Sequence, residues 1–134
     1  MPEIKKSDGR KKAAALAVAM MLWGSNSAQA YDAVYVFGDS LSDSGNIGRF
    51  TYSGADAALY DEILAERAGQ TLAPSQSGGT NYATGGATAV PETDPLYNTT
   101  GDQVSEYLSL TGGQADRDGL YIHWVGGNDL AAAA

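Results

Sequence analysis

Three apolar segments stand out along the chain, and they differ in length and in what surrounds them. Residues 13–23 form an unbroken apolar run of eleven residues. Residues 33–37 (AVYVF) and 120–125 (LYIHWV) are shorter runs rich in β-branched and aromatic residues, and glycines follow both. Short runs of this kind are typical of strands buried in a parallel sheet. The pattern predicts one N-terminal apolar segment and two strands.

The N-terminal apolar run has the flanks of a secretory signal peptide. Basic residues within 1–12 precede it, and a small polar stretch ending in Ala28-Gln29-Ala30 follows it. The run is too short to span a bilayer, which takes about 20 residues. We therefore expect cleavage after Ala30 and a mature chain, 31–134, that is secreted or located in the periplasm or outer membrane. A buried N-terminal helix or an uncleaved anchor is the alternative.

Two helices are expected between the strands. Within residues 55–68 apolar side chains recur at three- to four-residue spacing, and Gly69 is the stop signal. A second helix is expected over residues 102–110, with Thr100 as its cap. Residues 80–83 (TNYA), between the two helices, are a candidate short strand. Strands that alternate with helices predict an α/β fold with a parallel sheet.

Composition changes the picture of the mature chain in two ways. Residues 31–134 carry three basic residues, Arg49, Arg67 and Arg117, against fourteen Asp and Glu, a net charge of −11. A nucleic-acid partner needs a basic face, so this class of function is excluded. Cysteine is absent, so an exported form relies on packing without disulfides.

Polar, glycine-flanked segments follow the expected strands, where ligands of parallel sheets gather. Gly38-Asp39-Ser40 comes directly after the first strand, and a serine at such a corner presents its hydroxyl beside backbone amides. Alone, this tripeptide is a common turn or helix cap. A phosphatase with Asp39 as nucleophile would need a second aspartate at the position of Leu41.

Three longer strings, in order, decide between these readings. Residues 36–46 (VFGDSLSDSGN), 79–87 (GTNYATGGA) and 124–129 (WVGGND) resemble the first three blocks of the GDSL esterases and lipases, also called SGNH hydrolases. The resemblance spans residues 32–130 and is strongest to the bacterial secreted lipases. It implies a three-layer α/β/α fold with a parallel sheet, flavodoxin-like in arrangement and incomplete in this chain. Residues 31–134 are then the N-terminal part of the hydrolase domain.

The resemblance also implies roles for individual residues. Ser40 is the nucleophile that attacks an ester carbonyl. The amides of Ser40 and Gly86 and the side-chain amide of Asn128 form the oxyanion hole, with Gly86 preferred over Gly85. Taken singly, Gly85-Gly86 would be better explained as a tight turn and Asn128 as an Asx turn, but the joint pattern of the three blocks outweighs these explanations. No cofactor and no metal are implied.

One family element has no counterpart here. The family's general base and its orienting acid come from a late Asp-x-x-His motif, and this sequence stops before it. The sole histidine, His123, lies inside the second strand and is expected to be a packed or surface imidazole on the face opposite Trp124.

These residues lead to one expected function and two alternatives. The expected function is a secreted serine hydrolase that cleaves small-molecule or lipid esters through an acyl-enzyme on Ser40. The alternatives are a carbohydrate deacetylase or phospholipid acyltransferase with the same site, and a catalytically inactive truncated fragment. Outer-membrane anchoring would need a C-terminal part that is not in this sequence.

Overall fold

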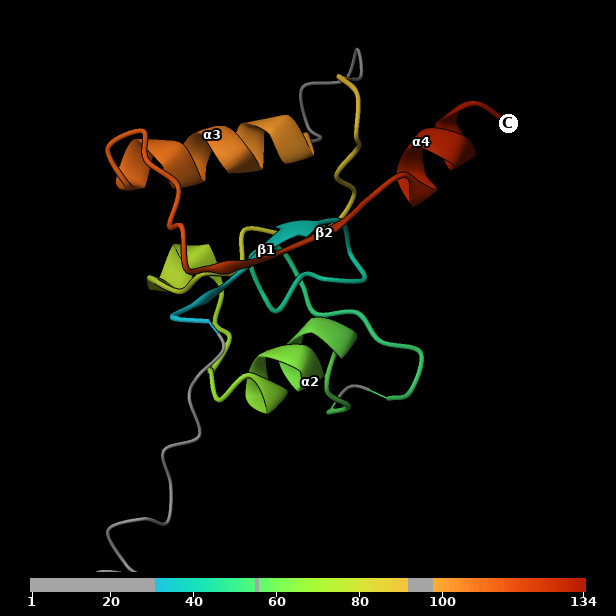
Figure 1. Ribbon diagram of the computed structural model, residues 1–134. Helices are drawn as coiled ribbons and strands as arrows, with labels where there is room; N and C mark the ends of the chain where they lie inside the picture. Colours follow the sequence, from blue (N-terminus) through green and yellow to red (C-terminus); the bar gives the residue numbers. More distant parts are fainter. Residues whose placement is uncertain (1–30, 55, 92–97) are drawn as a thin grey trace, which may run out of the picture.

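The computed structural model describes residues 31–54, 56–91 and 98–134, so the expected signal peptide lies outside the described residues. The elements follow the order β1 (Val34–Gly38), α2 (Tyr60–Arg67), the 3-10 turn η1 (Ser75–Ser77), α3 (Thr100–Leu110), β2 (Leu120–Trp124) and α4 (Gly127–Ala132) (Figure 1). Within the described part, no helix is long and apolar enough to cross a membrane.

β1 is the centre of a parallel sheet. β2 pairs with it on one side, in the register Val34↔Leu120 to Gly38↔Trp124. On the other side, residues 80–84 run parallel to β1, with hydrogen bonds from Val36 N to Thr80 O (3.1 Å) and from Tyr82 N to Val36 O (2.7 Å). The candidate short strand at 80–83 therefore does lie in the sheet, as a single parallel bridge. Because the chain moves to opposite sides of β1 in its two crossovers, the carboxyl end of β1 is a topological switch point.

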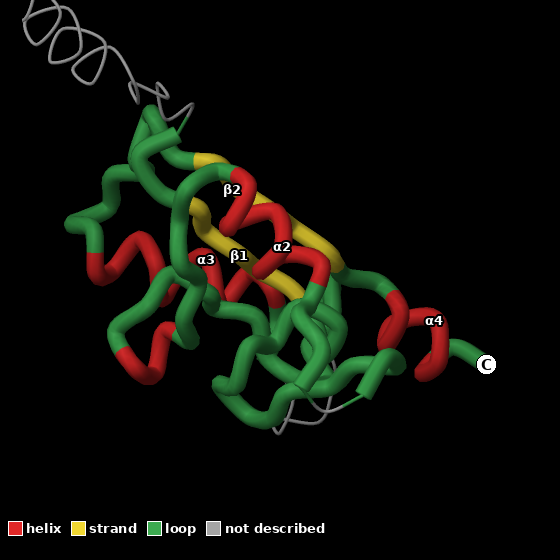
Figure 2. The backbone as a smooth tube through the Cα atoms, turned by 90° about the horizontal axis from the view of Figure 1, so that it is seen from below, coloured by secondary structure: helices red, strands yellow, loops and turns green. Residues whose placement is uncertain are grey.

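The two crossover helices cover opposite faces of this sheet. α2 lies on one side of the strands and α3 on the other (Figures 1 and 2). Right-handed crossovers in opposite directions produce this arrangement. Val34 and Val36 pack with Ala65 of α2, whereas Phe37 packs with Tyr107 of α3. The expected layered α/β architecture is confirmed, and β1 is buried on both faces as its apolar run predicted.

The helix boundaries differ from the sequence expectation. α2 begins at Tyr60, because Leu59 N donates to Glu62 Oε2 (2.8 Å) and closes the first turn there. Its inward residues are Asp61 and Ala65, whereas Ile63 and Leu64 are exposed. The expected apolar face was therefore partly wrong, because the carboxylate of Asp61 takes one of the two buried positions of the helix.

α3 begins two residues earlier than expected, and its cap is Thr99 rather than Thr100. The Thr99 hydroxyl accepts from Asp102 N (3.1 Å), and the Asp102 carboxylate accepts from Thr99 N (2.9 Å). The expected apolar residues Val104, Tyr107 and Leu108 do face the sheet. Helix α4, which the apolar pattern does not reveal, directly follows Gly126.

Candidate active site

The turn after β1 holds Ser40 at the switch point. Asp39 N donates to Trp124 O (3.2 Å), and the Asp39 carboxylate accepts from Leu41 N (3.0 Å). Ser42 N closes the turn on Asp39 O (3.0 Å). The amide of Ser40 is the one N–H of this turn with no partner among the described residues. It is therefore available to a ligand.

The three serines of the first block have different environments. Ser42 is fully buried, and its hydroxyl lies 2.8 Å from the Tyr60 hydroxyl. Ser44 is partly exposed, but its hydroxyl is buried and has no hydrogen-bond partner among the described residues. Ser40 is also partly exposed, and its hydroxyl, unlike those of Ser42 and Ser44, is not buried.

The second block distinguishes its two adjacent glycines. Gly85 N donates to the buried Asp43 carboxylate (2.9 Å), which also accepts four amides of its own loop, those of Gly45, Asn46, Ile47 and Gly48. Gly86 has φ +80°, a conformation that favours glycine, and its amide has no partner in the described part of the chain. A Cβ placed on Gly85 would lie 3.9 Å from Ser40 Cβ. Gly86 N–H therefore has no described partner and directly follows a residue that lies close to Ser40.

Two side chains of the third block, at the start of α4, hydrogen-bond to the backbone at and just after the second block. Asn128 Nδ2 donates to Ala87 O (2.8 Å), which leaves its other N–H without a described partner. The Asp129 carboxylate accepts from Ala89 N (2.9 Å) and Val90 N (3.1 Å), and the Ala89 bond is the main cause of the lowered pKa of Asp129. The geometry therefore brings together the segments of Ser40, Gly86 and Asn128.

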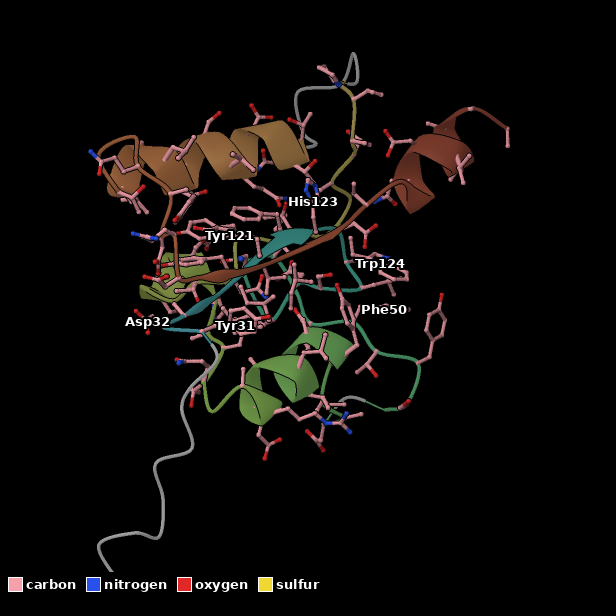
Figure 3. All side chains as sticks on the ribbon, in the orientation of Figure 1. Tyr31, Asp32, Phe50, Tyr121, His123 and Trp124 are labelled. Atoms are coloured by element: carbon pink, nitrogen blue, oxygen red, sulfur yellow. The ribbon has the colours of Figure 1, made fainter. Side chains whose placement is uncertain are left out.

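His123 lies away from this cluster. Its ring is 6.3 Å from that of Phe37, on the α3 face, whereas the Trp124 ring is 5.6 Å from that of Tyr60 on the α2 face (Figure 3). The expected opposition of His123 and Trp124 is confirmed. Among the described residues, no side chain lies within hydrogen-bonding distance of the Ser40 hydroxyl.

Two buried amide side chains at this site escaped the sequence reading. Asn81 donates to Ser42 O (2.7 Å) and to the Asp61 carboxylate (3.1 Å), so it joins the first block, the second block and α2. Gln103 of α3 binds the backbone of Gly38. Asn81 stood inside a recognised block, but only its tertiary contacts show its role. Gln103 had no signal, since a lone glutamine in a helix is ordinarily a surface residue.

Glycine at position 38 has a steric cause. A Cβ there would lie 2.5 Å from Trp124 O and 3.1 Å from Ser42 Oγ. The close approach of β2 to the end of β1 therefore requires this glycine.

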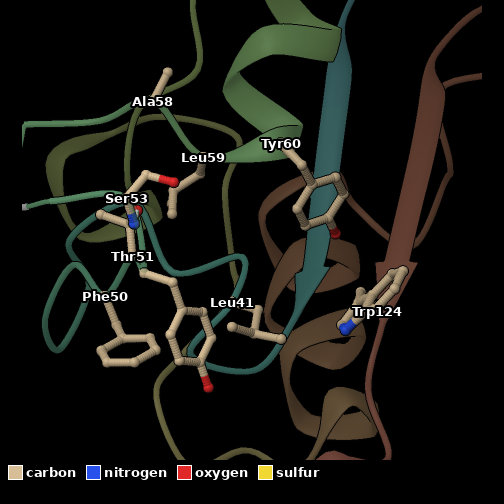
Figure 4. Close-up of a pocket in the computed structure, with 9 residues that line it drawn as sticks. Leu41, Phe50, Thr51, Ser53, Ala58, Leu59, Tyr60 and Trp124 are labelled. Carbon is tan, nitrogen blue, oxygen red and sulfur yellow. Dashed lines mark hydrogen bonds between the residues drawn. The ribbon is translucent and has the colours of Figure 1, made fainter.

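A hollow of about 250 Å³ opens beside the turn that follows β1. Leu41, Tyr60 and Trp124 line one side, and residues 50–53 line the other (Figure 4). Four of the residues that line it are aromatic, and burial raises the pKa of one of them, Tyr60. An apolar group bound next to Ser40 would fit such a lining. In residues 31–54, 56–91 and 98–134, no three acidic, histidine or cysteine side chains are grouped as a metal site.

Comparison with known proteins agrees with this geometry. The family model described as GDSL-like Lipase/Acylhydrolase matches residues 34–134. "Lipase 1" of Photorhabdus luminescens is 47% identical over 119 residues, which are 87% of this chain and 18% of that protein. The chain spans less than a fifth of the length of this curated relative. The structure agrees with these matches, since helices cover both faces of a parallel sheet and the three blocks meet at one end of it. The chain belongs to the GDSL-like lipase/acylhydrolase family.

Proposed function

We propose that Ser40 is the nucleophile of a carboxylic-ester hydrolase that works through an acyl-enzyme. The observation that carries the proposal is a pair of amides, Ser40 N–H and Gly86 N–H, that have no partner in the described part of the chain, together with a partly exposed Ser40. Neighbouring amides at Leu41, Ser42 and Gly85 are all hydrogen-bonded within the protein. Free amide donors gathered at one point are what a developing oxyanion needs.

In the first half-reaction, Ser40 Oγ forms a bond to the carbonyl carbon, and the carbonyl electron pair moves onto the oxygen. The amides of Ser40 and Gly86, with the remaining N–H of Asn128, hold this oxyanion. Its collapse breaks the bond to the alkoxide, which leaves as the alcohol with the proton taken from Ser40. Water then attacks the acyl-serine and releases the acid.

The proton of Ser40 needs a base. Family resemblance assigns this role to the histidine of an Asp-x-x-His pair, and the present sequence contains no such motif. His123 faces the other side of the sheet, so it does not supply this function. We propose hydrolysis for a form of the protein that carries the pair, with the hollow at Leu41 and Trp124 receiving an apolar part of the ester. We also propose export through residues 1–30.

A fluorophosphonate probe tests the nucleophile in such a form. Wild type should be labelled at one serine, and Ser40→Ala should abolish both labelling and p-nitrophenyl butyrate hydrolysis. Ser42→Ala and Ser44→Ala are the matched controls and should keep labelling, because both hydroxyls are buried. Undiminished labelling of Ser40→Ala would reject the assignment.

A further inference from the structure

Gln103 is a fully buried amide side chain between the two backbone segments of the proposed oxyanion hole. It has 0% exposure and projects from α3 toward the end of β1. Its Oε1 accepts from Gly38 N (2.8 Å), and its Nε2 donates to Gly38 O (2.9 Å) and to Thr84 Oγ1 (3.1 Å). The oxygen and both N–H groups of its amide therefore have hydrogen-bond partners.

The side chain of Gln103 takes the place of a backbone hydrogen-bond partner of β1. Along the shared edge, Val36 N bonds to Thr80 O, Tyr82 N to Val36 O and Thr84 N to Gly38 O. A regular parallel ladder would continue with Gly38 N bonding to Tyr82 O. Gln103 Oε1 takes that N–H instead. The ladder therefore ends at Gly38 on a side chain from α3.

Gln103 contacts the chain just before each of the two proposed amide donors. Gly38 lies two residues before Ser40, and Thr84 lies two residues before Gly86. The two proposed oxyanion donors come from separate segments, and both must lie 2.7–3.1 Å from one oxygen position. A contact spanning Gly38 and Thr84 fixes the distance between those segments just ahead of both donors.

We propose that Gln103 is a positioning residue of the oxyanion hole, which sets the separation of Ser40 N–H and Gly86 N–H by bridging Gly38 and Thr84. The inference rests on the proposed function of Ser40. It adds a residue on α3, remote in sequence from all three blocks, to the machinery of the reaction. Gln103 does not touch the ester; it acts through the backbone.

Kinetics of variants test this role in a form of the protein that hydrolyses p-nitrophenyl butyrate. Gln103→Leu should lower kcat about 10- to 100-fold with KM within about twofold, since small displacements of transition-state donors cost rates of this order. Its affinity for butylboronic acid, which forms a tetrahedral adduct with a reactive serine, should fall by a similar factor. Gln114→Leu, at an exposed glutamine, is the matched control and should change neither quantity.

Two further variants separate positioning from folding. Gln103→Glu keeps the acceptor for Gly38 N and can accept the Thr84 hydroxyl, so it should recover part of the lost kcat. Thr84→Val removes a single contact and should lower kcat several-fold without changing KM. Rates are compared well below each thermal midpoint. If Gln103→Leu does not fold, the kcat and KM of Thr84→Val test the positioning role in its place.

The inference is overturned if Gln103→Leu, or Thr84→Val in its place, lowers only the thermal midpoint and leaves kcat and butylboronate affinity at the control value. Ser40→Ala, measured in parallel, identifies which proposal has failed. Loss of activity in Ser40→Ala with full kcat in the Gln103 variants rejects the positioning role alone. Full activity in Ser40→Ala rejects both.

Discussion

Two adjacent acidic residues in the first turn of α2, Asp61 and Glu62, have opposite electrostatic environments. Asp61 is buried between Glu62 N (3.0 Å) and Asn81 Nδ2 (3.1 Å), and burial raises the pKa of its carboxyl to about 6. The adjacent Glu62 pairs with Arg49, and this hydrogen bond lowers the pKa of Glu62. The pKa values of these two sequence neighbours are thus shifted in opposite directions, because burial dominates at Asp61 and the hydrogen bond from Arg49 dominates at Glu62.

The raised pKa of Asp61 makes the stability of the folded protein depend on pH. Its pKa is about 6 in the folded state and 3.8 ordinarily, so the folded state binds this proton more tightly. The stability due to neutral Asp61 is fully present below pH 4 and is lost as pH rises through 6. We expect Asp61→Asn to remove this loss, so the variant's thermal midpoint relative to wild type should rise between pH 4 and pH 7.

Thermal midpoints at pH 4, 5, 6 and 7 check the prediction. Asp118→Asn, at an exposed aspartate, is the control and should stay parallel to wild type across the series. Parallel curves for Asp61→Asn as well would mean that the Asp61 carboxyl has an ordinary pKa in the folded protein.

Secondary-structure elements were predicted in type and order, but their ends were set by side-chain hydrogen bonds. The apolar runs located both strands to within a residue, because strands of a parallel sheet are rich in β-branched and aromatic residues. The expected burial holds for β1 but not for β2, whose side chains are partly or largely exposed. The start of α2 was misplaced because Glu62 closes the first turn on Leu59 N, and the start of α3 because adjacent threonines offer two caps of equal propensity. Only the reciprocal bonds of Thr99 and Asp102 select the first of them.

The cap of α3 is testable by one substitution. Thr99→Ala should destabilise the fold by about 1 kcal/mol, since it leaves Asp102 N–H without its acceptor. The Thr99 bonds also lower the pKa of Asp102, so that pKa should return toward its ordinary value in the variant. Urea unfolding measures the first effect, and an NMR titration of the Asp102 side chain measures the second.

Ser105→Ala is the control on the same helix, because its exposed hydroxyl bonds only to Gly101 O. This variant should be neutral or slightly stabilising, since alanine is the better helix former. Equal destabilisation by both substitutions would contradict the cap.

At the scale of the whole chain, we expect residues 1–30 to be removed on export and residues 31–134 to remain. Residues 1–30 hold five of the eight basic residues, and the rest of the chain is acidic. If the first region is a signal peptide, export should yield a chain that begins at Tyr31. Expression in a bacterium with an intact secretory system, followed by mass spectrometry of the periplasmic product, checks this terminus. A periplasmic product that still begins at Met1 would contradict the assignment.

The sequence by itself determined the α/β class, the two strands, the family and the residues proposed for catalysis, because strand burial and glycine-rich turns leave local patterns. The tertiary structure decided which groups around them are free and which are bonded. The resemblance preferred Gly86 over Gly85 by position alone, whereas the structure shows a physical difference between them, because Asp43 accepts from Gly85 N–H and no described residue accepts from Gly86 N–H. Gln103 looks like a surface residue of a helix, and it is buried because β1 ends where no strand carbonyl meets Gly38 N–H. Hydrogen bonds between residues far apart in sequence leave no periodic trace, so only the folded arrangement shows them.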